Sequence, residues 1–248
     1  MGSLRQRVSN AIRERLMRHY RIPFSRHGVP PGLISSLLGK SPITLIDVGA
    51  SSGEFAASTQ KMCGLRKALL VEPQPTRCLQ LRERFSQPEV VIRQCALSDR
   101  DTTVEMEILN WDFCSSLLPV RRDLSTVSGA LDLGMREKIS CSVQTIDGLL
   151  TELGWNDELI DLLKIDVQGA ELFVLRGAIQ SLRNVGTVFC EVSFQPLYEG
   201  SAVFSEIYDF MYGQGFQLVS MTEGFRGTDG ELFQADTVFK RRNLVSPF

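Results

Sequence analysis

Two acidic residues stand at the ends of two apolar runs early in the sequence. The run ITLIDVG contains Asp47 and continues into ASSGEFA, and the run ALLVEP closes with Glu72 and a proline. Gly49 and Gly53 bracket a tight turn after the first run. A glycine turn between a strand and the next helix lets a ligand lie against bare backbone at the carboxyl edge of a parallel sheet. The pattern therefore predicts a nucleotide-type site at this turn.

The composition of the turn favours a cofactor without phosphates. A dinucleotide-binding turn needs G-x-G-x-x-G, because the pyrophosphate reaches the helix N-terminus across the second glycine. Ser51 occupies that place, and a carboxylate at Asp47 repels phosphate but suits the ammonium and sulfonium groups of S-adenosylmethionine. A nicotinamide-dependent oxidoreductase is one alternative, and a catalytically silent interaction module that keeps the fold is another.

The adenosine part of such a cofactor has its own candidates. Glu72 follows the glycine turn by roughly 20 to 25 residues, the spacing at which an acid accepts ribose hydroxyls. The segment CALSD, which follows the third apolar run, is expected to line the adenine slot with Leu97 on the ring face. The residues expected at the cofactor are Asp47, Gly49, Ala50, Ser51, Gly53, Phe55, Glu72, Pro73, Ala96, Leu97, Ser98 and Asp166.

A second group of charged residues surrounds the segment LLKIDVQGAE. Methyl transfer is an in-line displacement, so the acceptor oxygen must lie about 3 Å from the methyl carbon. An alkyl hydroxyl also needs a base or a metal to help remove its proton. The candidates are Asp166 at a strand end, Glu191 at the next strand end, and Lys164. Lys164 alternates with Asp166 on one strand face and is suited to tuning its charge or, equally, to bonding a neighbouring loop. Glu171, in a first helical turn, fits a catalytic role and a helix-dipole role equally well.

Metal chemistry has few candidate ligands. The sequence has two histidines, His19 and His27, and both precede the first predicted strand. This argues against a serine-histidine triad or a histidine-rich zinc site in the main domain. Asp166 and Glu191 together are suited to a divalent cation that binds substrate oxygens, but we rank this below metal-free transfer.

The elements that position these residues alternate along the chain after Pro42. Strands alternating with helices of ten to fifteen residues predict βαβ crossovers and a parallel sheet. The last two strands are separated only by a turn-rich segment, so they should form an antiparallel hairpin at the sheet edge. We predict strands at 43–48, 67–72, 89–95, 159–166, 186–192, 216–221 and 235–240, a β excursion at 104–109 and 139–143, and helices at 53–62, 75–85, 145–153, 170–182 and 202–212.

Composition limits the class of protein. The 248 residues, 43% of them hydrophobic, suffice for one generous core. A net charge of −2 argues against a nucleic-acid binder. The six cysteines form no C-x-x-C pair, which is typical of reduced core thiols. The sequence has no apolar run of about 20 residues and no secretory h-region, so we expect a cytoplasmic protein.

The amino-terminal segment differs from the rest of the chain. Between Leu4 and Arg26 there are seven arginines and one acid, Glu14, and apolar residues recur at helical spacing. We favour an amphipathic helix packed across the domain, and a peripheral contact with an anionic membrane or a glycan carrier is the alternative. We therefore divide the chain into a basic helical segment, 1–41, and a main domain, 42–248.

Several motifs, in their order and spacing, resemble the FkbM-type family of S-adenosylmethionine-dependent methyltransferases. The resemblance covers about residues 43–241, and KIDVQGAE following TIDGLL is its most specific part. The motifs are IDVGASSGEF, VEP, CALSD, SSLLP, VQTIDGLL, LLKIDVQGAE and DTVFKRR.

The resemblance implies a class I methyltransferase fold, a Rossmann-like α/β sheet of seven strands that is mostly parallel, with an antiparallel last strand and helices on both faces. It implies oxygen methylation of polyketide, sugar or glycan hydroxyls. It also assigns cofactor roles to Asp47, Gly49, Gly53 and Glu72, and active-site positions to Asp166 and Glu171. Two residues depart from the family pattern, since Ser51 replaces a frequent asparagine and Gln168 replaces a usual glutamate.

The hydroxyl acceptor, a small molecule, sugar or glycan, is expected to contact two segments. One is the long loop 110–138, and the other is SFQPLYEG after the fifth parallel strand. Aromatic side chains beside amides and acids suit a sugar, although the same residues occur in ordinary lids. The acceptor candidates are Trp111, Ser115, Ser116, Gln168, Gln195 and Tyr198.

Overall fold

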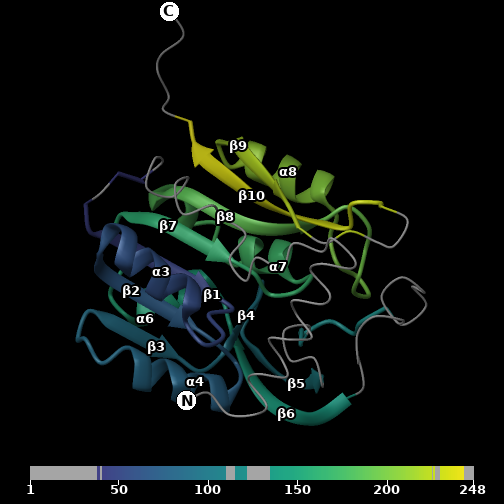
Figure 1. Cartoon of the computed structure of the whole chain (residues 1–248), viewed down its shortest axis with the longest axis horizontal. Helices are drawn as coiled ribbons and strands as arrows, with labels where there is room; N and C mark the ends of the chain where they lie inside the picture. The colour runs from purple at the N-terminus through teal and green to yellow at the C-terminus, as the bar shows by residue number, and fades with distance from the viewer. Residues whose placement is uncertain are drawn as a thin grey trace, which may run out of the picture.

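The protein forms one large sheet and one small sheet in the computed structural model (Figure 1). The structure describes residues 38–39, 41–109, 115–121, 135–224, 226 and 230–242. The predicted amino-terminal helix and Trp111 therefore lie outside the described residues. None of the helices in the described part of the chain combines the length and the apolar composition needed to cross a bilayer.

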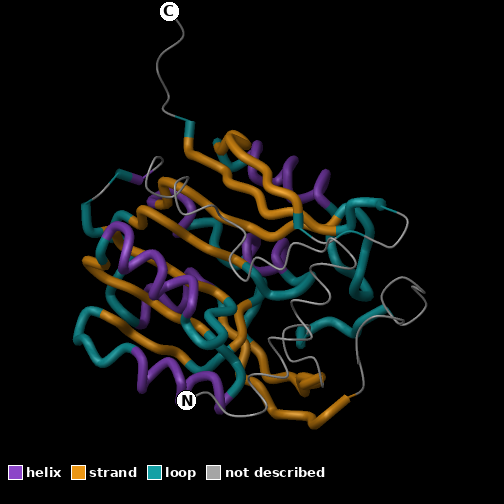
Figure 2. Tube along the Cα trace, viewed as in Figure 1, coloured by secondary structure: helices purple, strands orange, loops and turns teal. Residues whose placement is uncertain are grey.

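The large sheet has seven strands in the order β3-β2-β1-β7-β8-β10-β9, which form one continuous layer (Figure 2). Its first five strands run parallel, and β10 is antiparallel to both β8 and β9, as the sequence predicts. The strands are β1 (Ile43–Val48), β2 (Leu65–Val71), β3 (Val90–Arg93), β7 (Ile160–Ile165), β8 (Val185–Ser193), β9 (Phe216–Glu223) and β10 (Gln234–Arg241). The expected class I methyltransferase architecture is confirmed.

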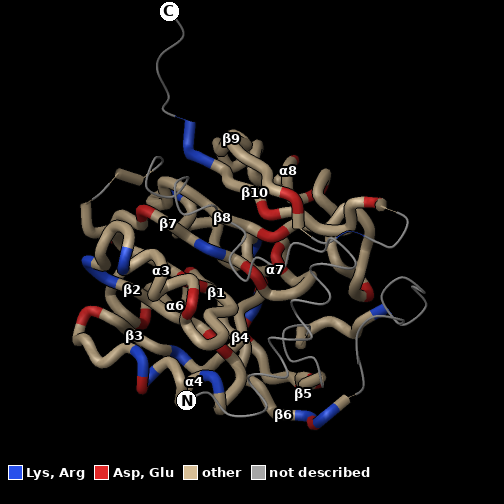
Figure 3. The backbone as a smooth tube through the Cα atoms, viewed as in Figure 1, with Lys and Arg blue, Asp and Glu red and all other residues tan. Residues whose placement is uncertain are grey.

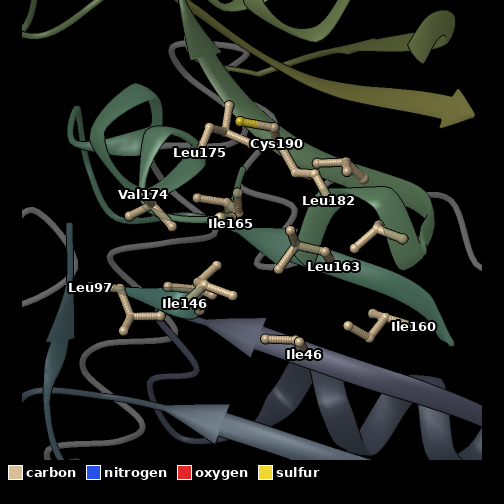
Figure 4. Close-up of a cluster of buried hydrophobic side chains, with 14 of the residues drawn as sticks. Ile46, Leu97, Ile146, Ile160, Leu163, Ile165, Val174, Leu175, Leu182 and Cys190 are labelled. Atoms are coloured by element: carbon tan, nitrogen blue, oxygen red, sulfur yellow. The ribbon is translucent and has the colours of Figure 1, made fainter. Parts of the chain in front are cut away.

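Helices cover both faces of the sheet, because the parallel strands are apolar on both sides. On one face, α3 and α4 pack against Leu45 and Leu70. On the other face, α6, α7 and α8 pack against Ile46 and Leu163 in a second cluster, part of which Figure 4 shows. The helices are α3 (Glu54–Cys63), α4 (Pro75–Arg84), α6 (Ile146–Glu152), α7 (Glu171–Arg176) and α8 (Phe204–Gly213).

The helix predicted at 170–182 is shorter in the structure. It ends at Arg176, and a 3-10 helix, η2 (Ser181–Asn184), follows. Gly177 is the C-cap of this helix, and a Cβ atom there would be 2.0 Å from the backbone oxygen of Ser98. The chain passes too close to its neighbour there for a side chain, and the sequence periodicity does not report this contact.

The predicted β excursion is a separate three-stranded sheet in the order β4-β6-β5. It consists of β4 (Ala96–Leu97), β5 (Thr102–Leu109) and β6 (Met135–Gln144). β5 and β6 are antiparallel, and Met106 and Ile108 pack on the inner face of this sheet. The small sheet therefore projects from the end of β3, beside the carboxyl edge of the large sheet.

The cysteines behave as expected of core thiols where the structure describes them. Five are buried and not joined in disulfides, and burial raises the pKa of Cys95 to about 12. A thiol with so high a pKa is unreactive.

Candidate functional site

The order of the strands reverses between β1 and β7, where β1 continues to β2 on one side and the chain later returns to β7 on the other. Ligands of open α/β sheets bind outside the carboxyl ends of strands at such a point. Asp47 on β1 lies beside Lys164 on β7 in register, and Asp166 follows the end of β7. The site is therefore built around these two strand ends.

Lys164 is the centre of a buried ion cluster. Its Nζ lies 3.2 Å from Asp47 Oδ1 and 3.5 Å from Asp166 Oδ2, and it donates a 2.8 Å hydrogen bond to the backbone oxygen of Gly49. Burial alone would lower the pKa of Lys164, but attraction by Asp47 and Asp166 raises it above the ordinary value. Lys164 therefore stays protonated and holds the glycine turn against the end of β7.

These contacts bear on the roles expected of Asp47 and Lys164. Asp47 is 0% exposed and ion-paired with Lys164, so its carboxylate faces that cation in this structure. Lys164 is 5% exposed and carries a raised pKa, so it is not a candidate base. The geometry fits both other interpretations of Lys164, since its Nζ lies 3.5 Å from Asp166 and also bonds the Gly49 turn.

The glycine turn is shaped first by contacts within the chain. Gly49 has φ 74°, and a Cβ there would lie 2.0 Å from the backbone oxygen of Asp166. Ser51 has a positive φ of 49°, and Gly53 is the N-cap of α3. The absence of a side chain at Gly49 is therefore needed to bring the turn into contact with the strand end that carries Asp166.

Glu72 has the geometry for a pair of hydroxyls. It is 4% exposed, its Oε2 accepts a 2.8 Å hydrogen bond from the Ser51 amide, and its Oε1 accepts a 2.9 Å hydrogen bond from the Gln74 amide. Burial raises the pKa of Glu72, and the two amides oppose that shift. A carboxylate has about four lone-pair sites, so each oxygen keeps one for a further donor. The two remaining acceptor sites of Glu72 fit the two hydroxyls of a ribose.

Three other predicted cofactor contacts belong to the hydrophobic core. Leu97 is 2% exposed and lies in the cluster of Figure 4, so it does not present an open face to an adenine ring. Phe55 stacks on Phe189 with ring centroids 5.6 Å apart, and Ala50 is buried with them in the cluster on the opposite face of the sheet. The remaining candidates nearby are Pro73, half-buried after Glu72, and the end of β4, where Ala96 is buried and the Ser98 amide donates to Gln144.

Glu171 shapes the turn that follows Asp166. Its Oε1 accepts hydrogen bonds from the amides of Val167 (3.1 Å) and Gly169 (3.0 Å). Burial raises the pKa of Glu171 to about 7, and the charge of Asp166 adds to that shift. Since this carboxylate is buried and bonded to the backbone, the structure places it in a positioning role.

Gln168 joins the two carboxylates expected to do the chemistry. Its Nε2 donates to Asp166 Oδ1 (2.9 Å) and to Glu191 Oε2 (3.2 Å), while its Oε1 accepts a 3.1 Å hydrogen bond from the Tyr198 hydroxyl. Its backbone has a positive φ of 58°. The side chain of Asp166 is 35% exposed, so the bridge leaves part of that carboxylate accessible.

Two residues of β10 complete this edge, and the sequence alone did not indicate them. Gln234 Nε2 donates a 2.8 Å hydrogen bond to Glu191 Oε2, and Asp236 lies opposite Glu191 in register. Figure 3 shows acidic positions side by side on β8 and β10. The predicted hairpin places β10 next to β8, but only the residue-by-residue register identifies these side chains.

Two acids at this edge, Glu191 and Asp236, have raised pKa values. Burial, followed by the charges of Asp166 and Asp236, raises the pKa of Glu191 well above its ordinary value. Burial, followed by Asp166, raises the pKa of Asp236 to about 7. At pH 7 the edge therefore carries bound protons as well as negative charge.

The expected divalent cation finds no support in this arrangement. Within the described residues, no group of three or more His, Cys, Asp or Glu side chains is placed to hold a metal ion. Asp166 and Glu191, the two ligands considered, are bridged by the Gln168 amide nitrogen. A hydrogen-bond donor in that place satisfies both carboxylates without a cation.

The structure brings some of the acceptor candidates together and separates others. Ser116 Oγ lies 3.5 Å from the Val167 oxygen, and Tyr198 reaches Gln168, so both contact the turn after Asp166. Ser115 instead accepts the Leu109 amide, and Gln195 donates to Glu231. Trp111 lies outside the described residues.

Residues 47–218 match the model of the Methyltransferase FkbM domain. The chain belongs to this family. FkbM membership identifies it as a methyltransferase and sets aside the nicotinamide-dependent oxidoreductase considered from the sequence.

This FkbM chain is similar to known proteins of the same fold. It is 28% identical over 212 residues to the 2-O-methyltransferase NoeI of Sinorhizobium fredii, covering 82% of this chain and 84% of NoeI. A crystal structure of methyltransferase FkbM from Methylobacillus flagellatus superposes with a TM-score of 0.50 at 14% identity, covering 79% of this chain and 43% of that one. The 1,6-didemethyltoxoflavin-N1-methyltransferase of Burkholderia thailandensis, with S-adenosylhomocysteine bound, gives a TM-score of 0.50 at 12% identity, covering 98% and 92%.

Proposed function

We propose that this FkbM methyltransferase moves the methyl group of S-adenosylmethionine to a hydroxyl oxygen of a sugar or glycan. One observation carries the proposal: the backbone of Asp166 lies against Gly49 of the glycine turn, and Gln168 bridges the Asp166 carboxylate to Glu191. The similarity to a 2-O-methyltransferase, NoeI, supports oxygen as the acceptor atom.

Several groups of this chain are suited to hold S-adenosylmethionine. Glu72 offers two free lone-pair sites to the ribose hydroxyls, and the Gly49 turn brings the backbone close to the end of β7. When bound, S-adenosylmethionine supplies a methyl carbon whose bond to the sulfonium sulfur breaks as the bond to the acceptor oxygen forms. The net negative charge of the cluster of Asp47, Lys164 and Asp166 favours a cationic group nearby.

Asp166 is the group that we assign to the acceptor proton. Its carboxylate is partly exposed, while Lys164 beside it supplies a positive charge and Gln168 fixes one of its oxygens. Glu191, with its raised pKa, retains its own proton over a wider pH range and is the weaker candidate base at neutral pH. A carboxylate within hydrogen-bond reach of the acceptor hydroxyl takes its proton as the new oxygen–carbon bond forms.

The experiment that tests this function has two parts. The first is calorimetry with S-adenosylhomocysteine, which should bind with micromolar affinity. The second is a screen of hydroxylated acceptors, sugars and glycan fragments first, with mass spectrometry for the gain of one methyl group. The net charge of −2 fits a neutral acceptor better than a nucleic acid. Absence of S-adenosylhomocysteine binding, or methyl gain on nitrogen or carbon acceptors only, would contradict the proposal.

A further inference from the structure

A groove of about 770 Å³ runs along the small sheet and is not part of the cofactor site. Its floor is the outer face of β5 and β6, where Glu105 and Glu107 point away from the buried Met106 and Ile108. Its wall is the segment 115–121 together with Glu199. The groove is thus formed between a β ribbon and an irregular segment, at the end of the molecule that carries the transfer site.

The wall of the groove is fixed to the transfer site. Ser116 lines the groove, and its hydroxyl lies 3.5 Å from the backbone oxygen of Val167, the residue after Asp166. Val120 forms a β-bridge with Tyr198, whose hydroxyl donates to Gln168. The Ser116 end of the groove therefore meets the turn that holds Asp166.

The charged lining suits a neutral polyhydroxylated ligand. Three carboxylates, Glu105, Glu107 and Glu199, are accompanied by two cations, Arg121 and Lys138. Carboxylates accept hydrogen bonds from hydroxyls, and the cations donate to ring and hydroxyl oxygens. An apolar acyl chain would desolvate these groups without compensation, and a polyanion would meet a lining with more carboxylates than cations.

The volume of the groove suits more than one sugar ring. Pockets of about 300–1,000 Å³ enclose drug-sized ligands, so 770 Å³ exceeds the need of a single ring. Apolar residues of the wall, among them Leu117 and Leu118, offer packing surface to the C–H faces of sugar rings. Lys138 lies opposite Glu107 in register, with 3.6 Å between Nζ and Oε1, so a donor and an acceptor lie side by side on the floor.

We propose that this groove binds the chain of a neutral oligosaccharide acceptor and that its Ser116 end presents the terminal sugar to Asp166. The inference rests on the proposed function and narrows it, because it selects an oligosaccharide over a monosaccharide or a polyketide. Ser116 is then a positioning residue, and Glu107 with Lys138 determines acceptor length.

The test is a glycan array that carries monosaccharides and neutral, sialylated and sulfated oligosaccharides of two to six residues, probed with the full chain saturated with S-adenosylhomocysteine. We expect retention on neutral oligosaccharides of three or more residues to exceed retention on monosaccharides at least tenfold. Glu107→Lys should reduce that retention at least tenfold, because it removes an acceptor and places a second cation beside Lys138. Asp209→Lys, on the exposed side of α8, is the matched control and should bind as the unmodified chain does.

Calorimetry with S-adenosylhomocysteine on all three proteins separates the two levels of the proposal. If the cofactor product does not bind, the proposed function fails. If S-adenosylhomocysteine binds equally to the three proteins, the array decides the groove assignment. The assignment is overturned if the array retains the chain on monosaccharides as well as on oligosaccharides, or if the chain prefers sulfated oligosaccharides. It is also overturned if Glu107→Lys is retained as strongly as the unmodified chain. An array that retains no neutral oligosaccharide overturns it as well.

Discussion

The amide nitrogen of Gln168 lies 2.9 Å from Oδ1 of Asp166, so an uncharged donor fixes the carboxylate that we assign to the proton. The same nitrogen reaches Glu191. The family pattern usually has a glutamate at this position, which would place three carboxylates within hydrogen-bond distance. The protonation of this edge therefore depends on one side-chain amide.

Gln168→Glu should move the acidic limb of the pH–rate profile to higher pH by about one unit or more, because a like charge raises the pKa values of neighbouring carboxyl groups. The profile of turnover against pH on a methylated acceptor checks this. Gln217→Glu on the exposed face of β9 adds the same charge elsewhere and should leave the profile in place. An unshifted limb in Gln168→Glu would show that the bridge does not control the reacting carboxyl group.

Glu72→Gln should weaken S-adenosylhomocysteine roughly 10- to 100-fold, because a charge-assisted hydrogen bond contributes about 1.5 to 3 kcal/mol. The substitution keeps the shape of the side chain but loses the charge and sets an amide donor against a backbone amide. Isothermal calorimetry measures the affinity, with Glu83→Gln on the exposed side of α4 as the control. If Glu72→Gln and Glu83→Gln bind S-adenosylhomocysteine equally well, Glu72 does not bind the ribose.

Lys164→Met should lower the free energy of unfolding by about 3 to 5 kcal/mol, because it leaves the buried carboxylate of Asp47 without its cation. For a chain of this size, that is a fall in melting temperature of roughly 6 to 20 °C. Adding Asp47→Asn should restore most of the loss, whereas Lys61→Met on the exposed side of α3 should cost little. If the double variant is no more stable than Lys164→Met, the ion pair is not the cause.

Stability should increase as the pH falls from about 8 to about 5. The pKa of Glu171 is about 7 in the folded chain against an ordinary value of 4.5, and that of Asp236 is about 7 against 3.8. The folded state therefore binds more protons than the unfolded state in this window, and the free energy of unfolding falls as the pH rises through it. Glu171→Gln should flatten the dependence in urea denaturation, and an unchanged slope would contradict the raised pKa.

The sequence predicted the fold well because the fold depends on periodic patterns. Apolar runs of strand length alternate with helical periodicity, and the missing helix between 216–221 and 235–240 correctly gave the antiparallel hairpin. The helix end at Gly177 was missed, because apolar residues at helical spacing continue past it to Leu182.

The site was predicted in part, for a related physical reason. Motif position places Asp47, Leu97 and Phe55 near the carboxyl edge of the sheet, but strand alternation and packing bury all three. Two candidate side chains on turns, Gln168 and Tyr198, are joined by a hydrogen bond. Asp236 could not be found because an antiparallel register is set by the folded hairpin and not by any motif.

The most direct measurement of the central claim follows a trideuterated methyl group from S-adenosylmethionine to the acceptor in the unmodified chain and in Asp166→Asn. We predict that the label resides on a hydroxyl oxygen, located by fragmentation mass spectrometry. Asp166→Asn should transfer it on the order of a hundredfold more slowly, with S-adenosylhomocysteine affinity nearly unchanged, as expected for the loss of a positioned base. Label on nitrogen or carbon, or equal transfer rates in the two proteins, would contradict the account.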